Sequence, residues 1–299
     1  MLRQPCSRLV ALTLLAAACA APLASGRTAN SEVAMAPGVQ SLNNGAIIPG
    51  VAPYDTIEPL FEAVGVVARH SGYHHSSEYI QGISGAAFRI AGICPCAPTC
   101  SSAMNPADLV RLLGYNLTVA DMQQTADSWQ SLQPLAEAYR ANGNAVPEPE
   151  DLEDPALAAQ ARAVHAVIDS VKASVRRGVP AIVWHAFTNA EYDVVTGYDD
   201  DTGEFLGWGS FGRPEDGSYG RAPQGRMVET AFFGGLPNAL LLSGPAGAFD
   251  APAAEAAALR AAVTHARSLE NVGRVEGDQW FMLQGLACYS RWAEDWASP

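Results

Sequence analysis

Basic residues are scarce in this chain of 299 residues, where 18 lysines and arginines stand against 31 aspartates and glutamates and the formal net charge is −13. No basic stripe is present that could displace the counterions around a nucleic acid, and the same deficit disfavours an anionic membrane surface. The acidic residues are spread as on an ordinary solvated surface. We therefore expect no nucleic-acid partner, and instead an unknown small molecule or peptide.

Long apolar runs are absent after the N-terminal region, so no transmembrane helix is expected. The run Leu9–Ala18 is itself too short to span a bilayer, and it follows Arg3 and Arg8 and precedes small residues. This pattern is typical of a signal peptide, here residues 1–26, of which the first 19 to 26 residues would be removed. The sequence therefore predicts export to the periplasm or the outside of the cell.

Cys19 provides an alternative way of processing this region. The segment Leu15-Ala16-Ala17-Ala18-Cys19 weakly resembles the lipobox of bacterial lipoproteins. Ala16 stands where a leucine would make the match stronger. Simple export is therefore favoured, and a lipid anchor at Cys19 stays open as the alternative.

Cysteines are few, and processing of the signal peptide would leave four of them: Cys94, Cys96, Cys100 and Cys288. An even number in an exported chain favours disulfides over free thiols. The first three form a C-x-C-x-x-x-C pattern, whereas zinc sites favour C-x-x-C pairs. We therefore expect Cys94, Cys96 and Cys100 to be disulfide candidates, and we expect neither a metal nor another cofactor.

The chain lacks internal repeats, and its 48% hydrophobic content is enough for a sizeable core. Residues 27–50 are rich in alanine, glycine, serine and asparagine and are interpreted as a linker. A folded domain is expected over residues 51–245, and a helical C-terminal segment packed on it is expected over residues 246–299. Capping residues, prolines and glycines mark where the individual helices and strands of these regions begin and end.

Apolar periodicity and capping residues predict both helices and strands. Helices are expected over residues 54–70, 76–81, 106–114, 123–141, 155–177, 250–269 and 277–296. Strands are expected over residues 181–184, 192–198, 204–208 and 238–242. Helices first, then mostly antiparallel strands, then helices again is the order of an α+β fold.

The segment Pro180–Phe211 is the most informative part of the chain. Its apolar run Ala181–Trp184 follows a helix and a Gly-Val-Pro break, which is typical of a buried strand. Two further runs flank the acidic turn Asp199–Gly203, and aspartate and glycine supply the local bonding and positive φ that a hairpin needs. The segment therefore predicts a strand followed by a β-hairpin.

This order of helix, strand and Gly-Tyr-Asp hairpin resembles papain-like cysteine peptidases of the bacteriocin-processing type. The box Gly82-Ile83-Ser84-Gly85-Ala86-Ala87-Phe88-Arg89 resembles proteins similar to the N-terminal domain of butirosin biosynthesis protein H, as does the ending Gln284–Trp292. The similarity spans roughly residues 50–296. It implies a papain-like core with a C-terminal helical pair, in a family of which one branch transfers acyl groups.

The chain departs from this family at the two positions that carry the chemistry. Glu191 stands six residues before Gly197, where the family has its histidine base. The nucleophilic cysteine would be near Asp55 or Thr56, yet no cysteine lies between Cys19 and Cys94. The resemblance therefore implies a scaffold from which the usual thiol and imidazole are missing, and ordinary thiol-peptidase activity is not expected.

Three alternatives follow for this site. One of Cys94, Cys96 and Cys100 is a displaced nucleophile with His185 as base, which disulfide formation disfavours. In the second, Asp55 and Glu191 share acid and base roles as a carboxylate pair. In the third, the cleft binds without reacting, and its residues would be Thr56, Arg89, His185 and Trp208. We expect a catalytically silent binding protein, a pseudoenzyme, with an amide or thioester hydrolase or acyltransferase as the alternative.

Glu191 itself separates two interpretations. If it faces the cleft, its carboxylate is paired, for instance with Arg89, or its pKa is raised, because an unpaired buried charge is costly. If it belongs to an exposed Asn189-Ala190 loop, it has no functional role. Its burial distinguishes the two.

Overall fold

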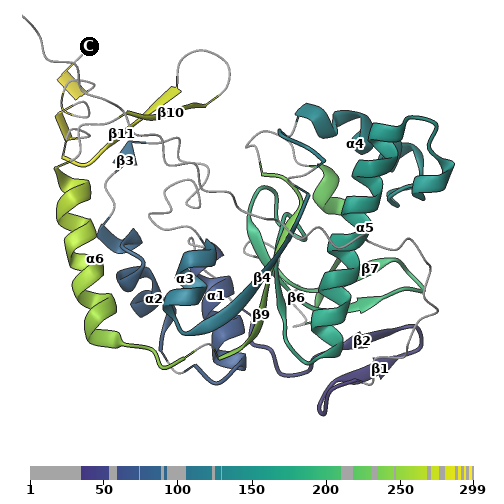
Figure 1. Cartoon of the computed structure of the whole chain (residues 1–299), viewed down its shortest axis with the longest axis horizontal. Coiled ribbons are helices and arrows are strands. Elements are labelled where there is room, and N and C mark those ends of the chain that lie inside the picture. The colour runs from purple at the N-terminus through teal and green to yellow at the C-terminus, as the bar shows by residue number, and fades with distance from the viewer. Residues whose placement is uncertain are drawn as a thin grey trace, which may run out of the picture. The chain divides into compact units, whose positions relative to one another are not determined.

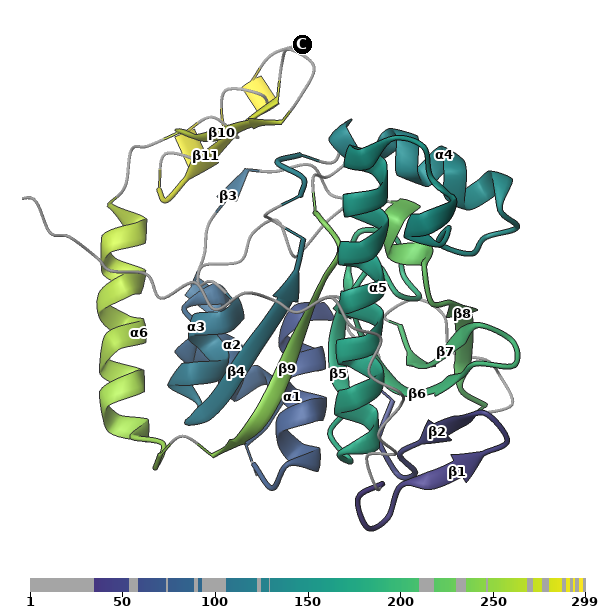
Figure 2. The same ribbon diagram turned by 45° about the vertical axis from the view of Figure 1, so that its right-hand side comes forward.

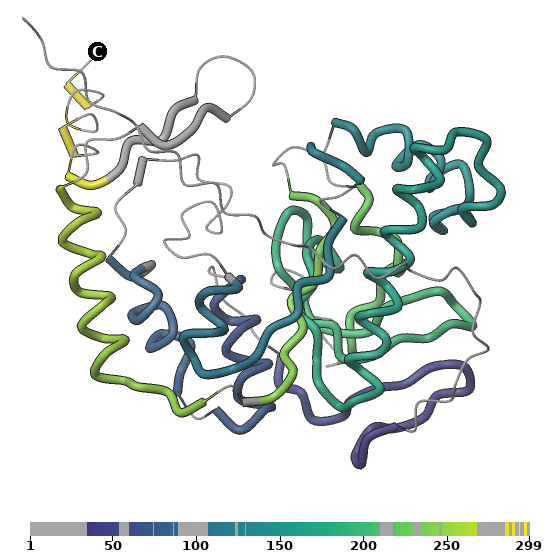
Figure 3. The backbone as a smooth tube through the Cα atoms, in the orientation of Figure 1, coloured from purple at the N-terminus to yellow at the C-terminus, as the bar shows by residue number. Residues whose placement is uncertain are grey.

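An antiparallel sheet flanked by helices forms the centre of the computed structural model, so the fold is α+β (Figure 1). The structure describes residues 35–53, 59–73, 75–88, 91–92, 106–122, 125–128, 130–209, 218–229, 235–245, 247–267, 271–275, 280–286, 289–290, 293 and 296–297. Figure 3 traces the backbone, with most of these residues in colour. The statements below concern these residues.

Eight strands of the described chain form the main sheet: β1 (Gln40–Leu42), β2 (Gly45–Ile47), β4 (Tyr115–Asp121), β5 (Ala181–Trp184), β6 (Tyr192–Asp199), β7 (Glu204–Trp208), β8 (Gly220–Pro223) and β9 (Asn238–Pro245). The order β4-β9-β5-β6-β7-β8 is antiparallel throughout. The hairpin β1-β2 pairs with the second half of β6, on the same edge as β5. A smaller sheet joins β3 (Ala91–Gly92), β10 (Asn271–Val275) and β11 (Trp280–Gln284).

The helices are α1 (Pro59–His70), α2 (Ser77–Ile83), α3 (Pro106–Leu112), α4 (Gln133–Ala141), α5 (Pro155–Arg176) and α6 (Ala251–Ala266). Their starts follow from the capping residues in the sequence. Ser76 caps α2, Asp154 caps α5 and Asp250 caps α6, each accepting a hydrogen bond from a backbone N–H of the first turn. Proline also occupies the first turn of α5 and α6, where its missing N–H costs nothing.

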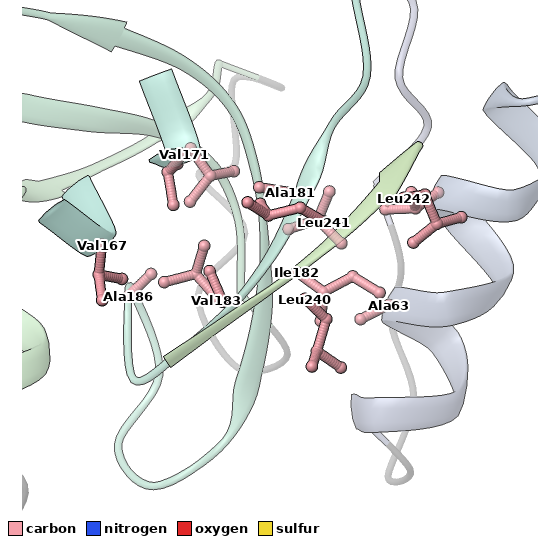
Figure 4. Packing of buried hydrophobic residues seen from close by; sticks show 14 of the residues in the cluster. Ala63, Val167, Val171, Ala181, Ile182, Val183, Ala186, Leu240, Leu241 and Leu242 are labelled. Atoms are coloured by element: carbon pink, nitrogen blue, oxygen red, sulfur yellow. The ribbon is translucent and has the colours of Figure 1, made fainter. Parts of the chain in front are cut away.

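Helices α1 and α5 cover opposite faces of the sheet (Figure 2). Successive side chains of a strand point to opposite faces, and β5 uses both of them. Ile182 points with Leu240 toward Ala63 of α1, whereas Val183 points toward Val167 of α5 (Figure 4). All of these side chains are nearly fully buried, so the core lies on both sides of β5.

The predicted hairpin is confirmed. Strands β6 and β7 pair from Val194↔Trp208 to Asp199↔Glu204, with a register shift between Val195 and Gly197. In the turn, Gly203 has a φ of 69°, and the N–H of Asp201 donates to the carboxylate of Asp199 at 3.0 Å. Aspartate and glycine therefore play the roles that the sequence indicated.

Four sequence expectations need correction. The linker over residues 27–50 is wrong for its last part, because β1 and β2 extend the sheet and the N–H of Ile48 donates to Thr196. The helix over residues 123–141 is shorter, since α4 begins only at Gln133 after a 3₁₀ turn at Gln130–Leu132. The final helix over residues 277–296 is wrong at β11, where aromatic and apolar residues form a strand. Strands β4 and β8 were not predicted.

Candidate functional site

The turn between β5 and β6 contains two of the predicted site residues, His185 and Glu191. The N–H of His185 donates to the carbonyl of Glu191 at 2.7 Å, and the N–H of Ala190 donates to His185 Nδ1 at 2.9 Å. His185 and Ala190 have φ values of 58° and 55°, a conformation that non-glycine residues rarely adopt. Hydrogen bonds within the turn therefore hold a strained backbone in place.

Asp193 supports the same turn from β6. Its Oδ2 accepts from the N–H of Phe187 at 2.6 Å and of Thr188 at 2.7 Å, and the side chain is fully buried. Burial raises the pKa of this carboxyl from its ordinary 3.8 to about 7, although the two backbone N–H groups act in the opposite direction. Asp193 is thus an internal cap for the turn.

Arg226 lies beside this turn, in the 3₁₀ segment Arg226–Glu229. Its Nη2 donates to Asn189 Oδ1 at 2.6 Å. Burial, with a contribution from Arg226, lowers the pKa of His185 to about 4, so the imidazole is neutral near pH 7. Because Nδ1 accepts from Ala190, the proton of this neutral ring is on Nε2.

Glu191 is buried, with 2% of its surface exposed, so the alternative of an exposed loop glutamate is wrong. Trp208 is a core residue: it is 6% exposed, its Nε1 donates to the carbonyl of Val51 at 3.2 Å, and its ring lies 5.0 Å from that of Tyr219. The other predicted site residues lie outside the described part of the chain: Asp55, Thr56, Arg89, Cys94, Cys96 and Cys100.

A second site, not predicted from the sequence, lies at the far end of α1. It is a cavity of about 460 Å³ lined by Ser71, Gly72, Tyr73, His75, Leu113, Gly114, Tyr115, Gly247 and Phe249. These residues come from the ends of α1 and α3, the start of β4 and the segment between β9 and α6. A pocket of this size with apolar walls and a few polar groups is typical of sites for small ligands.

Two glycine-capped helix ends build the walls of this pocket. After α1, the N–H of Gly72 donates to Arg69 and the N–H of Tyr73 donates to Ala68, and Gly72 has a φ of 92°. This is the Schellman arrangement, in which glycine adopts the left-handed conformation at no steric cost. After α3, Gly114 has a φ of 85°. In both cases the next residue, Tyr73 or Tyr115, turns inward and is 7% exposed.

Pairing of β4 with β9 brings the third wall to the pocket. Tyr115 lies opposite Pro245 in the ladder, and the N–H of Gly247 donates to the carbonyl of Gly114 at 3.3 Å. Phe249 follows, and its ring lies 5.8 Å from that of Tyr73. A hydrogen bond of 3.5 Å from the Tyr115 hydroxyl to the carbonyl of Ala68 ties the same strand to α1. Segments distant in sequence therefore meet at one pocket.

The Tyr73 hydroxyl is buried and has no hydrogen-bond partner in the part of the chain that the structure describes. Burial, with smaller effects of Tyr79 and Tyr115, raises the pKa of Tyr73, so the hydroxyl keeps its proton and acts as a donor. An unsatisfied buried hydroxyl costs about 1–3 kcal/mol.

The sequence did contain a signal for this pocket. Ser71-Gly72-Tyr73 and Leu113-Gly114-Tyr115 both place a tyrosine directly after a helix-ending glycine. Histidine is a common metal ligand, and several histidines lie near Gly72 in the sequence. Within the described ranges, no group of three histidine, cysteine, aspartate or glutamate side chains could hold a metal ion. None of the helices in those ranges is long and apolar enough to cross a membrane.

No family model matches the chain, and the searches of curated proteins and of solved structures find no significant match. The fold and the pocket therefore define the protein only as an α+β protein with an aromatic-walled cavity.

Proposed function

We propose that this protein binds a small organic molecule and that the pocket at the end of α1 is its binding site. The open pocket of about 460 Å³ supports the proposal, because its size and aromatic walls match what a small ligand needs. This site differs from the cleft that the family resemblance implies. That cleft would contain Asp55 and Thr56, which lie outside the described residues, whereas the pocket follows the last turn of α1.

The contacts of the β5–β6 turn favour binding over hydrolysis or acyl transfer. A general base needs a free lone pair near the substrate, but His185 Nδ1 accepts from Ala190. Asp193 is fully buried, and its Oδ2 accepts hydrogen bonds from two backbone N–H groups. Both groups thus have a structural task, and a silent relative of the papain-like family remains our proposal. The order α5, β5 and the β6–β7 hairpin supports that relationship.

Blocking the pocket tests the proposed function. A Cβ at Gly247 would meet no atom within 4 Å, so Gly247→Leu projects into open space without disturbing the fold. In thermal-shift assays with a panel of small amines, alcohols, carboxylates and aromatic compounds, a ligand should raise the Tm of the wild type by at least about 3 °C at saturating concentration. The same ligand should leave the Tm of Gly247→Leu unchanged.

Gly82→Leu is the matched control, because its Cβ also meets open space but lies on α2 outside the pocket lining. It should respond to the ligand as the wild type does. Equal Tm shifts in the wild type and in Gly247→Leu, for every active compound, would mean that binding occurs elsewhere and that the proposed pocket is not the site.

We also propose that the protein is exported and loses its first 19 to 26 residues. The n-region, apolar run and small residues before position 27 support this. Mass spectrometry of the protein from its native host should find a mature N-terminus between positions 20 and 27, or a lipid-modified Cys19. Recovery of the chain from the cytoplasm with Met1 in place would contradict export.

A further inference from the structure

Three of the four ring pairs within the described lining meet at steep angles, and the fourth, Tyr73 with His75, is inclined by 48°. The planes of Tyr73 and Tyr115 are inclined by 71°, and those of Tyr73 and Phe249 by 69°. His75 is inclined by 71° to Phe249. The walls of one cavity therefore present aromatic surfaces in different directions, which suits a compact, rounded group.

A flat aromatic ligand is less well served by this arrangement. Stacking of a planar ring on both of its faces requires two parallel aromatic walls with a gap between them. The rings of His75 and Tyr79 are nearly parallel, with 22° between their planes, but their centroids are only 4.6 Å apart and the two rings stack on each other. Tyr79 is also fixed from behind, because its hydroxyl donates to Glu255 at 2.7 Å. The described rings thus form inclined walls instead of two parallel walls between which a planar ring could stack. We call the lining rings of Tyr73, His75, Tyr115 and Phe249 the aromatic box.

The electrostatics of the box favour a cation. The face of an aromatic ring is the negative end of its quadrupole and attracts a positive group within about 6 Å. No lysine or arginine is among the described residues that line the pocket, and the chain as a whole carries a net charge of −13. No fixed positive charge in this described lining therefore repels a positive ligand.

The kind of cation follows from the hydrogen-bonding groups of the lining. A primary ammonium has three N–H donors that need acceptors when it is desolvated, and no carboxylate lines the pocket among the described residues. A fully methylated ammonium has no N–H group and leaves water more easily.

We propose that the pocket recognises a methylated ammonium group. The rings of Tyr73, Tyr115 and Phe249 form the walls against which the cation lies. This inference rests on the proposed binding function and narrows the ligand to a chemical class.

Calorimetric titration with choline and with its neutral isostere 3,3-dimethylbutan-1-ol tests the charge preference. The two probes have the same shape and hydroxyl, so a box that uses cation–π attraction should bind choline at least tenfold more tightly, which corresponds to about 1.4 kcal/mol. Equal affinity for the two probes, or no choline binding at millimolar concentration, would overturn the inference. Gly247→Leu keeps the net charge, so choline binding that survives in this variant reflects non-specific attraction and also counts against it.

Two substitutions test the named contacts. Phe249→Leu keeps an apolar side chain but removes a ring face, so it should weaken choline binding about tenfold, whereas Phe249→Tyr should preserve it. Tyr73→Phe keeps the ring and removes only the buried hydroxyl, so it should leave the binding of choline and of tetramethylammonium unchanged. If Phe249→Leu leaves choline binding unchanged, the ring does not contribute and the inference is wrong.

The outcomes also separate this inference from the proposed function. If a compound of the general panel binds and Gly247→Leu abolishes its binding while choline fails, the pocket is a binding site but its ligand is not a methylated ammonium compound. If Gly247→Leu abolishes no binding at all, the proposed function fails and this inference fails with it.

Discussion

Replacement of Gly207 by alanine is expected to destabilise the protein by more than about 3 kcal/mol, or to prevent folding. Gly207 lies opposite Val195 in the β6–β7 ladder, and a Cβ there would collide with the backbone carbonyl oxygen of Val194. It would also lie 2.9 Å from the ring of Phe187. A backbone oxygen inside a paired strand has no way to move aside, so the hairpin and the adjoining turn are lost together. Denaturant unfolding followed by circular dichroism measures the effect.

Gly82→Ala is the matched control for this substitution. Gly82 lies within α2, has no positive φ, and a Cβ there would meet no atom within 4 Å. Alanine is the better helix former, so this variant should gain about 0.5–1 kcal/mol. If Gly207→Ala unfolds at the same denaturant concentration as the wild type, the register of the β6–β7 hairpin is wrong.

The second large effect concerns pH and the two buried titratable groups of the β5–β6 turn. The pKa of Asp193 is raised to about 7 from 3.8, so its contribution to stability is fully present below pH 3.8 and is lost as the pH rises through about 7. The pKa of His185 is lowered to about 4 from 6.5, so its contribution is present above pH 6.5 and is lost as the pH falls through about 4. The two contributions oppose each other over the same window.

Single substitutions should therefore reveal opposite slopes. Asp193→Asn, which still accepts from the N–H groups of Phe187 and Thr188, should make the protein less stable by about 3 kcal/mol at pH 4 than at pH 7, relative to the wild type. His185→Asn should have the opposite effect: relative to the wild type, this variant should be more stable at pH 4 than at pH 7 by a similar amount. Asparagine is chosen because it tolerates the positive φ at position 185. The free energy of unfolding from urea titrations between pH 3.5 and 7.5 measures both.

The double variant serves as the control, because it lacks both groups and should approach the shallow pH dependence of the wild type. All other titratable groups are common to the four proteins and cancel in the comparison. Slopes of the same sign in the two single variants would contradict the assignment of opposed pKa shifts to Asp193 and His185.

Much of the secondary structure could be read from the sequence because its signals act over a few residues. Helices α2, α5 and α6 begin within one residue of the expected positions 76, 155 and 250, where Ser76, Asp154 and Asp250 cap them, and the acidic turn before Glu204 closes the expected hairpin. The strands that the sequence did not predict are those whose structure depends on the strand with which they pair. Strand β4 is half exposed and depends on β9, while β1 and β2 are only three residues each and become strands because β1 pairs with β2 and β2 pairs with β6.

The site shows the same division between local and distant causes. The sequence determined that two helices end at Gly72 and Gly114 with a tyrosine following each, because the left-handed backbone at a helix end selects glycine. Only the tertiary structure decided that these tyrosines and Phe249 share one pocket, since the antiparallel pairing of β4 with β9 brings them together. Likewise, the sequence located Glu191 directly before the expected strand 192–198 but left its exposure open, because its burial depends on elements packed around the turn. Contacts between segments more than a hundred residues apart leave no local pattern, which is why the pocket emerges only from the folded chain.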